Sequence, residues 1–144
     1  MDIQTVTTWP QLKALAVLAE EYSREEKRYD APFAIYAVEL ARLWQLQNYE
    51  FVLFSISGQP AGYAIMHTDA TLMNDALFIS DIYVTKPARG ADVFKTIIKH
   101  IQDTAAKLGL PRGEFNSKVP AVIWRRMTGQ NVTEKTTIVV HREK

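Results

Sequence analysis

The sequence predicts an α+β fold in which a central, mostly antiparallel sheet is flanked by helices. Helical periodicity dominates the first third of the chain, and three short β-branched or aromatic runs follow between residues 51 and 84. A long amphipathic pattern then begins directly after the last of those runs. Helices before and after consecutive strands are typical of a layered α+β domain.

Composition limits the class of protein. The 144 residues are 47% hydrophobic and 23% charged, which predicts one domain, 1–144, with a sizeable core. The net charge of +1 and the lack of an extended basic face argue against a nucleic-acid partner. Cysteine is absent, apolar runs such as 51–56 are too short to span a bilayer, and no signal-peptide pattern is visible. We therefore expect no membrane partner and no secretion by a signal peptide, and the lack of cysteine is compatible with the cytoplasm.

The N-terminal part predicts a short strand and two helices. Residues 2–7 form the strand, and Thr8 with Gln11 stands at capping-box spacing ahead of a helix. Residues 30–32 indicate a break, after which a second helix runs to about residue 47. The apolar face of this second helix is wide, so we expect burial on two sides. The buried stripe of the first helix is expected to contain Leu12, Leu15, Ala16, Ala19 and Tyr22.

The middle of the chain predicts a three-stranded meander. Apolar runs at 51–56 and 61–67 surround a turn that contains Gly58, which is a hairpin pattern. A polar loop over 68–75 leads to a third strand at 78–84.

A long helix follows the meander. Val93, Ile97, Ile101 and Ala105 recur every four residues, and Gly109 is placed to close the helix. Beyond it, we expect a short parallel strand at 113–115, a short helix at 119–127 and a last strand at 136–141.

The segment that begins with Asp81-Ile82-Tyr83-Val84 resembles the acetyl-CoA-binding core of the GNAT acetyltransferases, because five residues, a glycine and a long helix follow it. The element order is also that of a GNAT-like fold, although only 81–98 carries the resemblance at residue level. The resemblance implies that the cofactor's pyrophosphate binds the turn and the helix amides. It assigns this cofactor binding to Val84, Arg89, Gly90, Ala91 and Asp92.

The turn departs from the family pattern at two positions. Counting from Arg89, the family's small residues fall on Asp92 and Phe94. A carboxylate roughly 5 Å from a phosphate charge, at an effective dielectric of about 20, gives a repulsion of about 3 kcal/mol. Two interpretations follow: Asp92 stabilises or caps the helix in place of a phosphate, or a shifted turn still takes coenzyme A.

Two residues are candidates for catalysis. Asp81 aligns with an acidic residue of the family and could act as a base directly or through water, or be a strand-end carboxylate bonded to backbone amides. His67 ends the neighbouring strand, and histidine is a common general base, but a lone histidine at a strand end is more often a surface residue. The family's tyrosine acid would fall on Arg125, four residues before Gly129, and arginine is a poor general acid. No metal-ligand spacing is present.

These residues lead to three functional hypotheses. The first is a GNAT-like protein with an eroded acyl-CoA turn, no cofactor and no catalysis, which acts as a structural or interaction protein with protein partners in a larger assembly. GNAT-like domains occur among the virion proteins of short-tailed phages, so a virion component is one such role. The second is an acetyl-CoA-dependent N-acetyltransferase with an atypical phosphate-binding turn. The third is recognition of another anion or of a peptide in the same cleft.

Overall fold

The computed structural model describes residues 1–26, 33–68, 75–135 and 138–142. It contains one five-stranded sheet in the order β1-β2-β3-β4-β5, antiparallel except for the parallel pair β4 and β5. This confirms the predicted α+β class with a mostly antiparallel sheet. The strands are β1 (Asp2–Thr5), β2 (Tyr49–Ile56), β3 (Gln59–Thr68), β4 (Ala76–Val84) and β5 (Arg112–Phe115).

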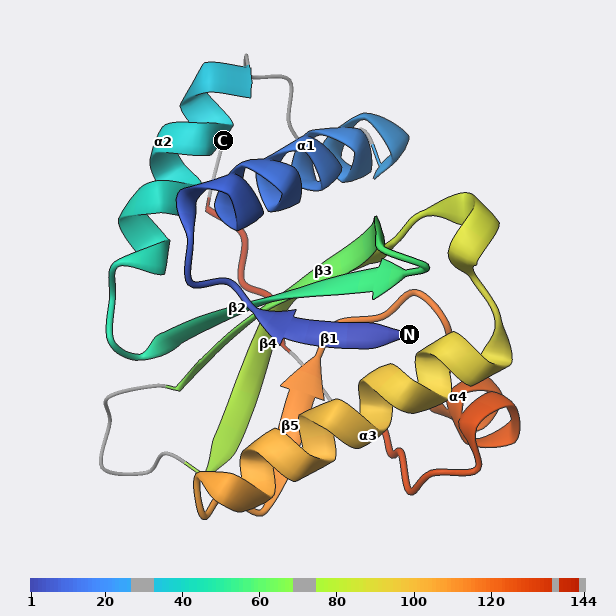
Figure 1. Ribbon diagram of the computed structural model, residues 1–144. Helices are drawn as coiled ribbons and strands as arrows, with labels where there is room; N and C mark the ends of the chain where they lie inside the picture. Colours follow the sequence, from blue (N-terminus) through green and yellow to red (C-terminus); the bar gives the residue numbers. More distant parts are fainter. Residues whose placement is uncertain (27–32, 69–74, 136–137, 143–144) are drawn as a thin grey trace.

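Helices cover both faces of the sheet. α1 (Trp9–Glu26) and α2 (Phe33–Trp44) lie on one face, and α3 (Ala91–Lys107) and α4 (Ala121–Thr128) lie on the other (Figure 1). Each face has its own core. Leu15 of α1 packs with Phe51 and Tyr63 on the first face, while Ile97 of α3 packs with Met66 on the second.

The predicted helix signals are observed. The Thr8 amide donates to Gln11 Oε1 over 3.1 Å and the Gln11 amide donates to Thr8 Oγ1 over 3.4 Å, so the capping box at the start of α1 is confirmed. Gly109, with φ of 72°, follows α3 in the left-handed conformation expected of a helix-closing glycine. The hairpin turn and the parallel strand β5 are also where the sequence predicts them.

Two predictions were wrong. The predicted last strand is absent from its described part: residues 138–142 form no strand, and Ile138 and Val140 are 85% and 89% exposed. The two-sided burial of α2 is also wrong, because α2 packs against α1 and β2 at the periphery (Figure 1) and Val38 is 71% exposed. The predicted break at 30–32, the loop at 69–74 and positions 136–137 lie outside the described residues.

One extra residue, Ser80, interrupts the regular pairing of β4. Ile65 of β3 pairs with Asp81, whereas the next residue, Met66, pairs with Ile79. Ser80 therefore has no partner in the register, and its hydroxyl donates to the Ile65 carbonyl over 3.3 Å. This arrangement is a β-bulge.

The bulge reverses the alternation of side chains along β4. Ile79 and Val84 both pack in the core that contains α3, whereas Tyr83 packs in the core of α1 and α2. Pairing with β5 also ends at the bulge, since the last pair is Ile79 with Phe115. Beyond it, β4 continues through Ser80–Val84 without a β5 partner.

We expect deletion of Ser80 to cost only about 1 kcal/mol, like Ser80→Ala, because Ile79 and Asp81 pair with adjacent residues of β3 and keep their faces in a regular ladder. Deletion of Ile82 should instead destabilise the protein severely, by about 4 kcal/mol or more, because it exchanges the faces of Tyr83 and Val84. Denaturant midpoints of the three variants and the wild type measure the difference. Equal destabilisation by the two deletions would contradict the assignment of Ser80 as the extra residue.

Candidate functional site

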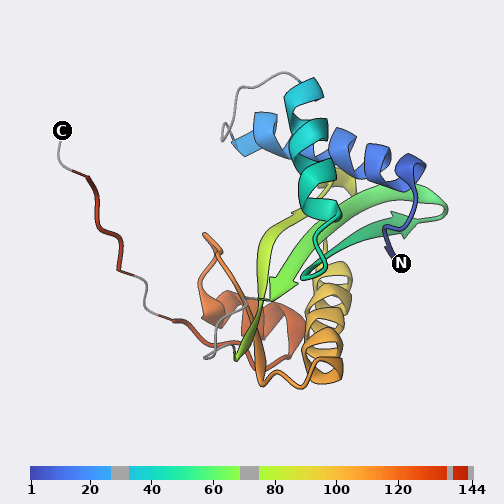
Figure 2. The same cartoon turned by 90° about the vertical axis from the view of Figure 1, so that its left-hand side faces the viewer.

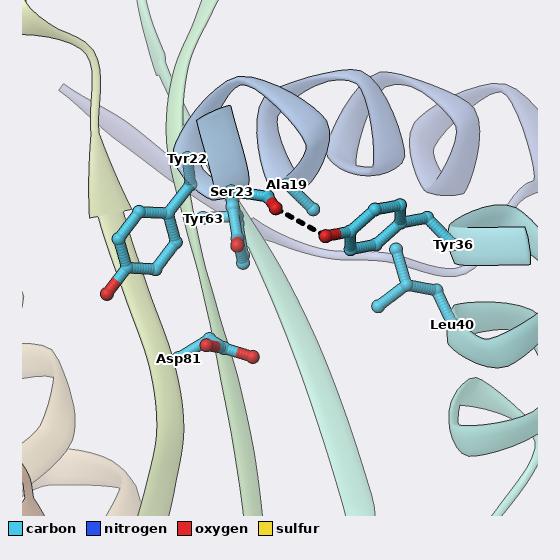
Figure 3. A pocket seen from close by; sticks show the side chains of 7 residues that line it. All are labelled: Ala19, Tyr22, Ser23, Tyr36, Leu40, Tyr63 and Asp81. Atoms are coloured by element: carbon cyan, nitrogen blue, oxygen red, sulfur yellow. Dashed lines mark hydrogen bonds between the residues drawn. The ribbon is translucent and has the colours of Figure 1, made fainter. Parts of the chain in front are cut away.

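A cavity of about 280 Å³ lies between the α1–α2 layer and the sheet (Figure 3). α1 and α2 form one side of it, and β3 and β4 form its floor. The lining residues are Ala19, Tyr22 and Ser23 from α1, Tyr36 and Leu40 from α2, Tyr63 from β3 and Asp81 from β4.

The lining of this cavity is aromatic and acidic. Asp81 carries the one carboxyl group among the described lining residues, and the phenols of Tyr22, Tyr36 and Tyr63 surround the same space (Figure 3). The hydroxyl groups of Ser23 and Tyr36 share a hydrogen bond. A carboxylate beside aromatic rings favours a cation, so the cavity suits an ammonium group.

The bulge explains why Asp81 reaches this cavity. Since Ser80 shifts the alternation, Asp81 and Tyr83 share the face of β4 that is covered by α1. Tyr83 stacks on Tyr22, with ring centroids 5.0 Å apart. The predicted site residue Asp81 therefore lies in a cavity built mainly from residues that the sequence indicated only as helix packing.

The turn after β4 leads into the N-terminus of α3. A short 3₁₀ helix, Lys86–Ala88, precedes Arg89 and the N-cap residue Gly90, which has no side chain that could cap α3. Gly90, Ala91 and Asp92 are exposed. The open end of a long helix favours an anion through its first amides and its dipole.

Arg89 is bound by the protein itself. Its Nη2 donates to Glu25 Oε1 over 2.7 Å and its Nε donates to the Val84 carbonyl over 2.8 Å. The Tyr83 hydroxyl donates to Glu25 Oε2 over 3.1 Å. Hydrogen bonding by Arg89 lowers the pKa of Glu25, whereas burial and hydrogen bonds to Glu21 and Glu25 raise the pKa of Tyr83. Of the predicted cofactor contacts, Arg89 thus already joins α1 to the turn, and Val84 accepts a hydrogen bond from it.

Phe94 and Asp92, the two residues of the turn that depart from the family pattern, differ in their burial and contacts. Phe94 packs edge-on against Trp124 of α4 at a centroid distance of 5.4 Å, so its ring is part of the α3–α4 core. Asp92 lies exposed in the first turn of α3. The negative charge of Asp92, rather than the bulk of Phe94, is therefore the feature that opposes a phosphate here.

His67 lies apart from the lining residues of the cavity. It stacks between Tyr49 and Phe78 on the neighbouring strands, with centroid distances of 4.8 and 5.6 Å. It pairs with Phe78, beyond the bulge from Asp81. The structure does not bring the two candidate catalytic residues together, and a catalytic role for His67 stays a prediction.

Arg125, at the position of the family's tyrosine acid, binds a backbone carbonyl. Its Nη1 donates to the Val132 carbonyl over 2.7 Å, and the neighbouring Trp124 is buried, as expected for a helix that packs on the sheet. Within the described ranges, no cluster of three or more metal-ligating side chains occurs and no helix is long and apolar enough to cross a membrane.

Comparisons with known proteins agree with this geometry. The sequence pattern of the acetyltransferase (GNAT) family matches residues 9–120. No curated protein matches the chain.

Several solved structures share the fold. A ribosomal-protein-alanine N-acetyltransferase from Brucella melitensis biovar Abortus 2308 is 22% identical, with a TM-score of 0.72 and coverage of 98% of this chain and 99% of that one. An aminoglycoside 6'-N-acetyltransferase from Acinetobacter haemolyticus is 18% identical, with a TM-score of 0.70 and full coverage of both chains. An aminoglycoside acetyltransferase from an uncultured soil metagenomic sample, in complex with sisomicin, is 17% identical, with a TM-score of 0.74 and coverage of 99% and 96%.

We expect Glu25→Gln to lower stability by about 1 kcal/mol at neutral pH, because it removes the charge that pairs with the partly exposed Arg89. Since folding lowers the pKa of Glu25 below 4.5, its contribution is complete above pH 4.5 and is lost as pH falls through the lowered value. Thermal unfolding at neutral pH and at a pH below the lowered pKa of Glu25 measures this contribution to stability. Glu39→Gln is the control, because Glu39 forms an exposed pair with Arg42 and its replacement should change stability little. A deficit that persists at low pH would contradict the assignment.

Proposed function

Because the chain belongs to the acetyltransferase (GNAT) family, we propose that it is an acetyl-CoA-dependent N-acetyltransferase whose acceptor amine enters the tyrosine-lined cavity. The observation that carries the proposal is the position of Asp81. Asp81 is a residue of β4, and its carboxylate lines the cavity. Beyond the bulge, β4 no longer pairs with β5, so this strand borders both the cavity and the open edge of the sheet.

The residues of the turn support a fit to acetyl-CoA. The exposed first residues of α3 offer amides and a helix dipole for the pyrophosphate, and the unpaired edge at Ser80–Val84 offers backbone groups for the rest of the cofactor. When bound, acetyl-CoA would supply the acetyl group as an activated thioester. Asp92 opposes this fit by charge, which predicts weak rather than absent binding.

Asp81 would act on the acceptor. Its carboxylate would hold the acceptor's ammonium group in the cavity and take its proton, directly or through a water molecule. The neutral amine left behind has the free electron pair that acetylation needs. The tyrosine rings would orient the rest of the acceptor.

The acceptor is expected to present a compact amine. A volume of about 280 Å³ admits the end of a molecule around its reacting nitrogen. The neighbours named above include enzymes that act on a ribosomal protein and on aminoglycosides, so we propose testing both an N-terminal peptide amine and an aminoglycoside.

A non-catalytic interaction protein is the second candidate. It is favoured by the exposed carboxylate of Asp92 at the phosphate position and by the use of Arg89 in a bond to Glu25. In this case the fold would serve protein partners and acetyl-CoA would not bind. The virion and cytoplasmic locations stay predictions.

We expect Asp81→Asn to lower kcat by about 100-fold, because an amide cannot accept the ammonium proton. Release of the coenzyme A thiol with a panel of primary amines measures the rate. The melting temperature should still rise with acetyl-CoA, since the cofactor site is separate. Asp75→Asn, at an exposed ion pair with Arg112, is the matched control and should keep full activity. Absence of thiol release with every amine, together with no thermal shift at millimolar acetyl-CoA, would favour the non-catalytic candidate.

Removing the charge of Asp92 should strengthen cofactor binding. We expect Asp92→Asn to lower the Kd for acetyl-CoA by about 10-fold, less than the unscreened repulsion implies because the side chain is exposed. Calorimetric titration measures the Kd. Asp103→Asn, an equal charge change further along α3, should leave it unchanged. If Asp92→Asn binds no tighter than Asp103→Asn, the pyrophosphate does not lie at this turn.

A further inference from the structure

The C-terminal end of α1 is bound to both chain segments that leave the sheet where β4 and β5 stop pairing. Glu25 and Glu26, the last two residues of α1, are both acidic. Glu25 binds Arg89 in the turn after β4. Glu26 Oε2 accepts a hydrogen bond from Lys118 Nζ over 2.7 Å, in the loop that leads from β5 to α4. This loop, orange in Figure 2, rises towards the layer of α1 and α2, so one helix end contacts both segments.

Glu25 occupies Arg89 in the way that a phosphate would. Carboxylate and phosphate oxygens accept the same charge-assisted hydrogen bonds from a guanidinium group. The N-cap residue Gly90 and the first helical residue Ala91 follow Arg89 directly, and both are exposed. Glu25 is therefore an internal anion at the turn where the proposed function places the pyrophosphate of acetyl-CoA.

Arg89 has two contacts that do not depend on Glu25. Its Nε donates to the Val84 carbonyl over 2.8 Å, and its guanidinium carbon lies 5.7 Å from the centre of the Tyr83 ring. The bond to Glu25 uses a different nitrogen, Nη2. This bond can thus break while the guanidinium group keeps the contacts that orient it, and Nη2 can then donate to another anion.

Two further interactions keep Glu25 on Arg89. The Tyr83 hydroxyl donates to Glu25 Oε2 over 3.1 Å, and the pair of Glu26 with Lys118 fixes the same turn of α1. The side chains of Arg89 and Glu25 are 37% and 20% exposed, and that of Lys118 is 88% exposed. Ion pairs with this much contact with water are weak, so a ligand with several negative charges can displace them.

We propose that Glu25 and Glu26 form an autoinhibitory latch, in which Glu25 occupies Arg89 and Glu26 holds the end of α1 in place until the pyrophosphate of the acetyl donor displaces them. The latch rests on the proposed function, since it takes that donor as the ligand. A site that is open in only a fraction of the molecules has an apparent Kd that rises as this fraction falls. The latch therefore weakens donor binding without preventing it.

Calorimetric titration with coenzyme A tests the latch on the full chain. We expect Glu25→Gln/Glu26→Gln to bind coenzyme A about 10-fold more tightly than the matched control Glu20→Gln/Glu39→Gln. The control removes the same two charges from ion pairs within α1 and within α2, so it has the same net charge and keeps the latch. Equal Kd values for the two double variants would overturn the proposal.

Glu26 tests the latch without a change at Arg89. Because Glu26 binds Lys118 and not the turn after β4, its role is to position Glu25. Glu26→Gln alone should therefore lower the Kd for coenzyme A by about 3-fold, in the same direction as the double variant but less. A Kd equal to that of Glu20→Gln would show that Glu26 does not hold the latch.

Hydrogen exchange of the wild type supplies a measurement that does not depend on a variant. At saturating coenzyme A, we expect the amides of residues 23–26 to exchange faster, because the end of α1 has lost both of its bonds, while the amides of 91–93 exchange more slowly. Faster exchange at 23–26 is the reverse of the protection that a bound ligand usually confers. Unchanged or slower exchange at 23–26 in the bound protein would overturn the release of the helix end.

Failure of the latch and failure of acetyl transfer give different results. Tighter binding of coenzyme A by the Glu25→Gln/Glu26→Gln variant, with no thiol release from acetyl-CoA and any amine, would support the latch and count against catalysis. Acetyl transfer with no difference between the two double variants would overturn the latch alone. Absence of coenzyme A binding in the wild type and in every variant would overturn both.

Discussion

The bulge at Ser80 is the constraint on which the candidate site depends. One extra residue in β4 turns Asp81 towards α1 and α2, and pairing with β5 ends at the same point. A regular strand would have placed a carboxylate against the apolar core of α3. The acidic cavity and the open sheet edge thus meet at one point of β4, which agrees with the frequent occurrence of bulges next to active sites.

α1 connects the two halves of the site. Ala19, Tyr22 and Ser23 line the cavity, and Glu25, about one turn further along, binds Arg89 at the turn before α3. An anion at that turn would compete with Glu25 for Arg89, so cofactor binding and the position of the end of α1 are expected to be linked. The same bond gives the fold part of its stability above acidic pH.

Sequence patterns predicted the elements whose signals are local. The capping box at Thr8, the closing glycine Gly109 and the periodicity of α3 each specify an element without reference to the rest of the chain. The sequence predicted the tertiary arrangement of these elements less well. Residues 138–141 have strand propensity but no strand partner in the described chain, and the outer face of α2 is apolar yet exposed. The sequence did not predict the cavity and singled out only Asp81 among its lining residues, because the tyrosines come from distant elements and have the pattern of ordinary core residues.

The proposed binding surface for an acetyl donor consists of the end of β4 and the start of α3. Amide spectra of the ¹⁵N-labelled protein, titrated with acetyl-CoA, test this most directly. The largest shift changes are expected at residues 80–84 and 90–93, on the two sides of the turn. Unchanged spectra at millimolar acetyl-CoA, or changes confined to other elements, would contradict it.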